Sequence, residues 1–346
     1  MQRLLWFLLL LLLLSLTFGV SLGPVPIPVA KVWGIAADRL GLSSGGDWST
    51  AQANIVWLIR FPRVLLAAFV GGGLAVVGVT LQALVRNPLA DPFLLGITAG
   101  ASVGAVLAIG LGVFAFAGVY GVSVGAFAGA LIAFLAVFLM AQRGGRMTPQ
   151  RLILAGVAVS YVFSGVTSFL TITSENRLLA GQVLSWTLGS LARARWADLT
   201  LPALALLLGT LYLILQARAL NALLMGDESA TGVGIDVTRL RRTLFVVTAL
   251  ITGVLVAVSG SIGFIGLVVP HMVRGLVGSD HRRVLPIAAL VGSLFLIWVD
   301  VIARTAFGLS FASSVAAQRN ACVSRRYLGL AVTGRVSSCR SRGTAG

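Results

Sequence analysis

The chain has very little charge and few of the residues that build catalytic or metal sites. Charged residues make up 10% of its 346 positions, against about a quarter in a soluble domain. Lys31 is the only lysine, which excludes the Gly-Lys-Ser/Thr of a phosphate-binding loop. The two histidines, His271 and His281, lack the partner residues that a zinc site requires. We therefore expect no enzyme activity, no metal and no cofactor in this chain.

Cysteine is absent from the first 321 residues and occurs only as Cys322 and Cys339. A disulfide framework and a thiolate metal site are thus excluded for the body of the chain. Hydrophobic residues make up 58%, and the mean hydropathy is +1.00. No soluble core could hide so much apolar surface, so we predict an all-α polytopic membrane protein. The net charge of +16 then reflects basic loops between spans rather than binding of nucleic acid.

A window of about 20 apolar residues predicts nine membrane spans. These candidate spans cover residues 4–22, 64–85, 93–114, 118–141, 152–172, 200–216, 243–259, 262–278 and 285–306. The first run, about 19 residues, exceeds a signal-peptide core of roughly 7–15, although a cleaved signal is the alternative. The eighth span is short and broken by Pro270. Residues 173–199 are too polar to span, so we expect an interfacial helix held by Trp186 and Trp196.

Basic residues set the predicted orientation. With a cytoplasmic N-terminus, the inner loops hold twelve lysines and arginines and the outer loops eight, which favours this orientation. Glycines recur every four residues in "GASVG" (Gly100, Gly104) and "GVSVGAFAG" (Gly121, Gly125, Gly129). Such faces let helix backbones approach closely in lipid, so tight bundle packing is the favoured interpretation and a glycine-lined pore the alternative.

One compact charged segment interrupts the apolar pattern, and it lies on the predicted cytoplasmic side. Residues 220–242 read "LNALLMGDESATGVGIDVTRLRR" and contain three of the ten acidic residues. Asp227 and Ser229 are good helix N-caps, Gly232 and Gly234 good stops, and Asp236 or Thr238 can cap the helix that follows. An ordinary solvated loop is one interpretation, and a docking helix for a cytoplasmic subunit is the other.

A longer pattern favours the docking helix. Residues 60–101 read "RFPRVLLAAFVGGGLAVVGVTLQALVRNPLADPFLLGITAGA", and residues 259–304 begin "SGSIGFIGLVVPHMVR". Together with the charged segment, these stretches closely resemble the FecCD family, the permease subunits of importers for iron–siderophores, haem and cobalamin. The resemblance covers about residues 50 to 306. It implies a type II ABC importer permease bundle of ten spans in the inner membrane.

The resemblance also implies partners and site residues. A second permease copy or a paralogue would complete the path. Two cytoplasmic ATPase subunits would carry ATP and Mg²⁺, and a periplasmic or lipid-anchored binding protein would dock outside. The ATPase-coupling residues would be Leu220, Asn221, Gly226, Asp227, Glu228, Ser229, Gly232 and Gly234. The arginines that meet the binding protein would be Arg60, Arg63 and Arg304. Structural or gating residues would be Arg86, Asn87, Pro88, Asp91, Pro92, Pro270 and His271, with His271 packed or hydrogen-bonded rather than a ligand.

The end of the chain departs from the family. Residues 1–306 form the predicted permease domain, with a cytoplasmic coupling segment at 218–242. Residues 307–346 are rich in arginine and serine and contain no acid and no tenth span. This abrupt change is typical of out-of-frame translation, and a genuine tail is the alternative. A frameshift would leave an inactive permease.

Ionisable residues are nearly absent inside the spans, which argues against a proton- or sodium-coupled carrier. We therefore expect a subunit that moves a ferric siderophore or similar chelate with energy from a partner. Haem or cobalamin is the alternative cargo, and a membrane scaffold without transport is the alternative class.

Overall fold

The computed structural model describes residues 2–43, 45–143, 146–174 and 178–306. The predicted tail at 307–346 lies outside them. Within the described residues, seven helices are long and apolar enough to cross a membrane, and two shorter apolar helices match the third and eighth predicted spans. In chain order the nine are α1 (Gln2–Ser21), α4 (Phe61–Val85), α5 (Ile97–Leu111), α6 (Gly121–Ala141), α7 (Pro149–Ile172), α9 (Thr200–Leu215), α12 (Val237–Ser259), α13 (Ile265–Val277) and helix 281–306 (His281–Ala306).

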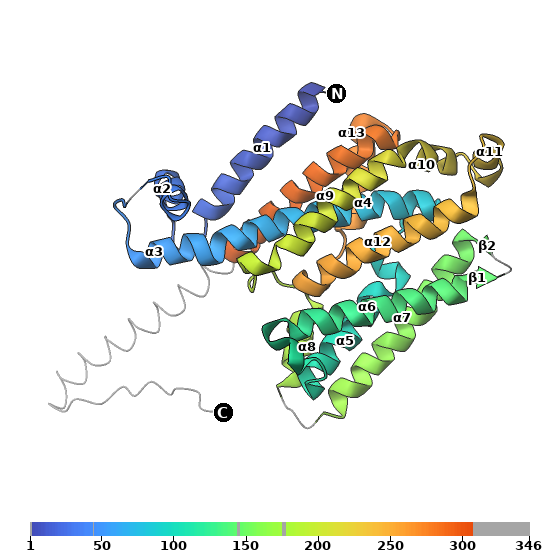
Figure 1. Ribbon diagram of the computed structural model, residues 1–346, viewed down its shortest axis with the longest axis horizontal. Coiled ribbons are helices and arrows are strands. Elements are labelled where there is room, and N and C mark those ends of the chain that lie inside the picture. Colours follow the sequence, from blue (N-terminus) through green and yellow to red (C-terminus); the bar gives the residue numbers. More distant parts are fainter. Residues whose placement is uncertain (1, 44, 144–145, 175–177, 307–346) are drawn as a thin grey trace, which may run out of the picture.

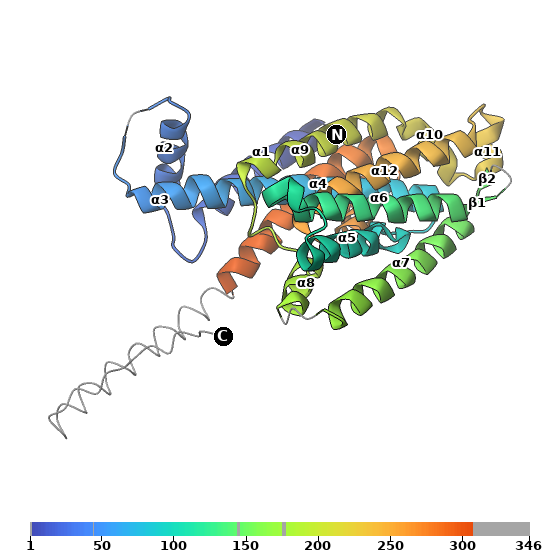
Figure 2. The same cartoon turned by 60° about the horizontal axis from the view of Figure 1, so that its bottom comes forward.

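Shorter elements cap the two ends of this bundle. They are α2 (Val29–Arg39), α3 (Thr50–Asn54), the π-helical η1 (Ile55–Arg60), η2 (Pro92–Leu95), η3 (Ala115–Tyr120), β1 (Gln142–Arg143), β2 (Arg146–Met147), α8 (Leu179–Thr187), η4 (Trp196–Asp198), α10 (Ala217–Leu224) and α11 (Asp227–Gly232). Figures 1 and 2 show α11 and the β1–β2 hairpin at one end of the bundle, and α2 and α3 at the other. We call these the α11 end and the α2 end.

Helix α4 is the centre of the bundle, since 89% of its most apolar window is buried. Its glycines allow three neighbours to approach its backbone. A Cβ at Gly71 would lie 2.2 Å from the carbonyl oxygen of Gly292, and one at Gly78 would lie 2.0 Å from that of Gly266. Gly73 faces Leu255 of α12. Small residues are what lets helices pack at such distances in lipid.

The glycine faces of α5 and α6 meet each other, which confirms the predicted tight packing. A Cβ at Gly104 would lie 1.9 Å from the carbonyl oxygen of Gly125, and one at Gly100 would lie 2.4 Å from that of Gly129. The space beside these glycines is therefore occupied by the backbone of the neighbouring helix, so they do not line a pore.

Two predicted spans are shorter than expected. The third was placed at 93–114, but a 3-10 turn, η2, occupies Pro92–Leu95, and Gly96 at φ +75° separates it from the fifteen-residue α5. The eighth, α13, has thirteen residues, and its helix continues through the buried Pro270 rather than breaking there. Between α7 and α9, a nine-residue helix, α8, lies inside the segment for which an interfacial helix was predicted.

Contact between α4 and α13 gives a stability prediction. We expect Gly78→Ala to lower the free energy of unfolding by about 1–3 kcal/mol, because its methyl group has no room against the α13 backbone. Gly165→Ala in α7 is the matched control, since a Cβ there meets nothing within 4 Å. Unfolding in detergent measures both, and equal stability of the two variants would contradict the packing described for α4.

Candidate coupling and docking sites

The charged segment folds into two short helices at the α11 end. Helix α10 is held by the fully buried side chains of Leu220 and Leu223, and α11 by Ala230. Gly226, at φ +114°, makes the corner between the two helices and is the N-cap of α11. Gly232 is the last residue of α11, and Gly234, at φ +82°, turns the chain toward α12. The predicted glycine stops are confirmed.

The predicted caps are only partly correct. Asp236 is the N-cap of α12, and its Oδ1 accepts a hydrogen bond from the Arg239 amide at 2.9 Å. Asp227 and Ser229 are not N-caps, because both lie inside α11. The Ser229 hydroxyl instead donates to the Met225 carbonyl at 3.4 Å, and the Asp227 carboxylate is taken by arginines.

Asp227 is the most heavily paired carboxylate at this end. Arg241 of α12 donates to its two oxygens at 2.7 and 2.8 Å, and Arg86 at the end of α4 lies 3.4 Å from Oδ1. The hydrogen bonds from Arg241 lower the pKa of Asp227 below its ordinary value. The pair therefore contributes stability at and above the ordinary pKa of about 3.9, and loses it as the pH falls through the lowered value. The Asp227 carboxylate is therefore ionised at neutral pH.

Glu228, the next residue, has the opposite environment. Its side chain is exposed, as are those of Ser229, Met225 and Val233 around it. The two acidic residues that the sequence could not tell apart thus face in different directions: Asp227 into the chain and Glu228 outward.

Asn221 attaches α10 to the start of helix 281–306. Its Nδ2 donates to Asp280 Oδ1 at 2.8 Å, and its Oδ1 accepts from the His281 amide at 2.9 Å and lies 2.7 Å from His281 Nδ1. The hydrogen bond from Asn221 lowers the pKa of Asp280. The coupling segment is therefore joined to a third membrane helix, besides α4 and α12.

Side-chain hydrogen bonds shape the turn after α4. Arg86, at φ +53°, ends α4 in the left-handed region. Asn87 Oδ1 accepts from the Leu89 amide, and Asp91 Oδ1 accepts from the Phe93 amide, both at 2.9 Å. Asp91 therefore caps the η2 turn that leads into α5, with Pro92 as its first residue. Burial raises the pKa of the Asp91 carboxyl. Pro88, in the same turn, is exposed.

Of the two predicted structural or gating residues in α13, Pro270 is buried and His271 is exposed. Two environments were expected for His271, packed or hydrogen-bonded, and the structure contradicts the first, because the residue is exposed. Arg274 of α13 makes a polar contact inside the chain: it donates to Gln82 of α4, and Gln82 in turn donates to the Gly266 carbonyl at 3.2 Å. Within the described residues, no group of three His, Cys, Asp or Glu side chains could hold a metal ion.

The three arginines predicted to meet the binding protein form one cluster near the α2 end, which we call the outer cluster after its predicted side. Arg63 donates to both oxygens of Asp300 at 2.7–3.0 Å, and Arg304 Nε lies 3.5 Å from the same carboxylate. Arg60, only 5% exposed, donates to the backbone carbonyls of Val20, Ser21 and Val25, and Arg304 donates to that of Gly19. These guanidinium groups are used inside the chain, where they join α1, α4 and helix 281–306.

The charges of this cluster do not balance. Arg63 and Arg304 share the Asp300 carboxylate, and Arg60 donates only to backbone carbonyls, so three guanidinium groups and one carboxylate leave two positive charges in excess (3 − 1). Arg63 keeps 20% of its side chain exposed, against 8% for Arg304. The cluster is thus an internal joint that can still attract an acidic partner through Arg63.

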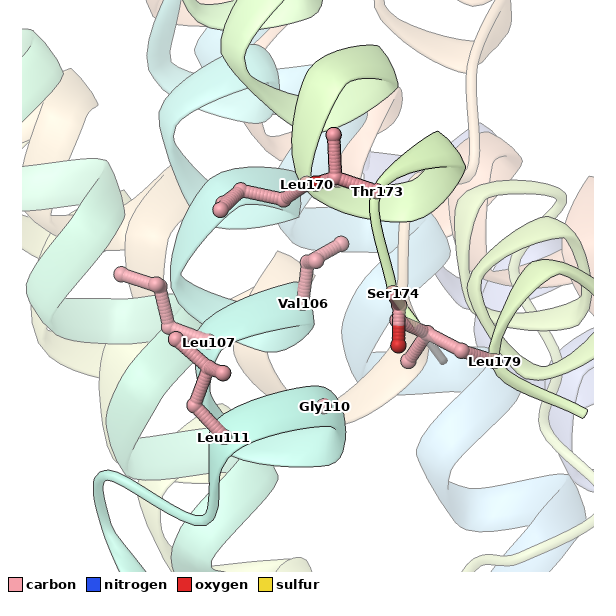
Figure 3. A pocket seen from close by; sticks show the side chains of 8 residues that line it. All are labelled: Val106, Leu107, Gly110, Leu111, Leu170, Thr173, Ser174 and Leu179. Atoms are coloured by element: carbon pink, nitrogen blue, oxygen red, sulfur yellow. The ribbon is translucent and has the colours of Figure 1, made fainter. Parts of the chain in front are cut away.

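A cavity of about 390 Å³ opens between α5, α7 and α8 (Figure 3). Aliphatic side chains surround it, with the hydroxyl-bearing Thr173 and Ser174 at the end of α7. The third and fifth spans therefore supply its walls.

Sequence reasoning missed Arg241, Asp280 and Arg274. Arg241 follows Asp227 by fourteen residues across a glycine turn, and no helical periodicity relates two residues on different helices. Only its position beside Arg239 and Arg242 was visible, and a cluster of arginines does not show which of them turns inward.

Loss of the single carboxylate in the outer cluster tests its structural role. We expect Asp300→Asn to lower the free energy of unfolding by about 3–5 kcal/mol, because it leaves largely buried arginines without a counter-charge. Asp47→Asn, which removes an exposed partner of Lys31, should leave stability unchanged. Thermal unfolding in detergent compares the two, and an Asp300→Asn variant as stable as the control would refute the joint.

Comparisons with known proteins agree with this architecture. Residues 8–316 match the FecCD transport family, and the match continues ten residues past position 306. The chain is 44% identical to the cobalamin import system permease protein BtuC of Halobacterium salinarum over 82% of this chain and 73% of that protein. It is 43% identical to the hemin transport system permease protein HmuU of Yersinia pestis over 77% of this chain and 81% of the relative.

A third relative, the ferric enterobactin transport system permease protein FepD of Escherichia coli, is 37% identical over 86% of each chain. Among solved structures, a metal-chelate type ABC transporter in an inward-facing conformation superposes with a TM-score of 0.76. Its sequence is 30% identical, and the match covers 88% of this chain and 91% of the other. The chain is a membrane-embedded permease and belongs to the FecCD transport family.

Proposed function

We propose that this permease moves a metal chelate into the cytoplasm, with a ferric siderophore as the first candidate cargo and haem or cobalamin as the alternative. The observation that carries the proposal is the α10–α11 segment, which exposes Glu228 to a partner while three contacts attach it to the membrane helices. Family permeases work with ATPase and substrate-binding partners, so ATP and Mg²⁺ would be bound by another subunit.

The cargo proposal also has a physical basis. The cavity between α5, α7 and α8 offers aliphatic walls and two hydroxyl groups. Such a lining suits the passage of a bulky chelate without tight binding. Selectivity would then lie in the binding protein.

The remaining assembly follows from the same proposal. The α11 end would face the cytoplasm, with the N-terminus on the same side in an inner membrane. Two ATPases would dock there, a second copy or a paralogue would complete the path, and a periplasmic or lipid-anchored binding protein would meet the α2 end. Residues 307–346 remain either an out-of-frame tail or a genuine one, and intact mass spectrometry of the native protein decides between them.

Reconstitution tests the function. The chain, its genomic neighbour ATPase and its binding protein are placed in proteoliposomes, and uptake of ferric enterobactin, haemin and cyanocobalamin is measured with ATP and with a non-hydrolysable analogue. ATP-dependent uptake of one chelate supports the proposal. Uptake that depends on a proton gradient and does not depend on ATP would indicate a secondary carrier. Absence of uptake for all three chelates would favour a scaffold or an inactivated permease.

Glu228 gives a sharper prediction about the ATPase. Glu228→Arg should reduce co-purification of the ATPase about tenfold, a change of about 1.4 kcal/mol in binding, while the permease stays folded because this side chain is exposed. Arg39→Glu, an exposed charge reversal on α2 at the other end of the bundle, is the control. Equal recovery of the ATPase with both variants and with wild type would remove α11 from the interface.

The outer cluster gives a prediction about the binding protein. We expect Arg63→Ala to weaken retention of the binding protein by about tenfold or more, since paired charges at interfaces contribute about 1.5 kcal/mol or more. Arg195→Ala is the control: Arg195 is also exposed, but it pairs locally with Asp198. Surface plasmon resonance at low and high salt measures both, and unchanged affinity in Arg63→Ala would assign docking elsewhere.

A further inference from the structure

One carboxylate on α11 receives arginines from two different membrane helices. Asp227 is bound by Arg241 of α12 through two hydrogen bonds of 2.7 and 2.8 Å and approached by Arg86 of α4 at 3.4 Å. We call these three residues the Asp227 joint. A six-residue helix such as α11 has too few internal hydrogen bonds to be stable alone. Its position therefore depends on its attachments.

Arg241 is the buried member of the joint. It is 3% exposed, while Asp227 and Arg86 are partly accessible. Its Nη1 also lies 3.5 Å from the Met147 carbonyl oxygen of β2. A buried guanidinium is costly unless it is paired, so the geometry of Arg241 is fixed by Asp227. Two parallel hydrogen bonds fix direction as well as distance, which a single contact would not.

The joint separates two tasks on one short helix. Glu228 faces outward, where a partner can contact it, and Asp227 faces inward, where it contacts α12 and α4. A force applied to the face of α11 that carries Glu228 is then transmitted to α12 and α4 through the contacts of Asp227. Helix α4 is the buried centre of that bundle, so a displacement of its end also reaches the helices packed on it.

We propose that Arg241 is a positioning residue for coupling: it makes α11 and the start of α12 one rigid piece, so that movement of a docked ATPase reaches α12 directly and α4 through Arg86. The inference rests on the proposed function for its driving partner. The attachment itself is a property of this chain alone. Asn221, which ties α10 to helix 281–306, supplies a separate connection that should survive loss of the joint.

The attachment is tested first in the full chain without partners. Hydrogen exchange of residues 227–232 is measured in nanodiscs for Arg241→Met, for Arg241→Lys and for a charge swap. The swap combines Asp227→Arg with Arg241→Asp and also carries Arg86→Gln, so that the new arginine does not meet a second positive charge. We expect exchange at least tenfold faster in Arg241→Met, intermediate in Arg241→Lys because lysine cannot make the bidentate contact, and restored protection in the swap. Arg239→Met, an exposed arginine on the same helix, is the control and should match wild type.

Transmission is tested in the complex with the ATPase. Cys322 and Cys339 are replaced by serine, and spin labels at Thr243 of α12 and Arg151 of α7 report the distance change caused by ATP. In Arg241→Met the ATPase should still co-purify and hydrolyse ATP, because Glu228 is untouched, but the ATP-induced change should be lost. The charge swap should recover the ATP-induced distance change. If the loss in Arg241→Met came only from damaged folding, the swap would not restore the change.

The outcomes are distinct. If hydrogen exchange of residues 227–232 is unchanged in Arg241→Met, Arg241 does not hold α11 in place. If exchange becomes faster but the ATP-induced distance change is intact, Arg241 does not transmit the movement of the ATPase. Loss of both, with recovery in the swap, supports the proposal. A wild-type chain that retains no ATPase refutes the proposed function, and the coupling role falls with it even if the exchange result stands.

Discussion

Close backbone contact along α4 is the constraint on which the rest of the structure depends. In a membrane, an apolar side chain gains no hydrophobic free energy by moving from lipid into a helix interface, because both surroundings are apolar. Helices therefore associate through packing and hydrogen bonds. Gly71 and Gly78 let helix 281–306 and α13 approach to distances that no larger residue would allow. With α4 fixed in the centre, the helices around it have defined neighbours, and the segments at both ends can be positioned precisely.

Polar joints at the two ends complement this apolar middle. At the α11 end, Asp227 and Asn221 each tie a short helix to membrane helices. Near the α2 end, Asp300 joins Arg63 and Arg304. Glycine contacts hold the middle of the bundle together, whereas an ion pair with one largely buried member resists separation because breaking it leaves an uncompensated charge. The polar contacts at the two ends therefore hold the short segments on the membrane helices.

The two neighbouring acids of α11 show how one short segment serves two contacts. Glu228 is available to a partner and Asp227 is committed inside the chain. The same division holds for the outer arginines, where Arg63 is partly accessible while Arg60 is buried among carbonyl groups. In both places a surface contact and an internal joint are adjacent, so binding on the outside can disturb the pairing inside.

The sequence by itself determined the membrane class, the nine apolar helices, the glycine packing of α5 on α6 and the cap formed by Asp236, because these depend on composition and on local periodicity. Tertiary structure alone decided which way each charge faces. It turned Asp227 toward Arg241, left His271 exposed, buried Arg60 and shortened the third span with a 3-10 turn. The physical reason is that partners in these contacts come from helices far apart in the chain, and a charge is stable inside only where such a partner arrives.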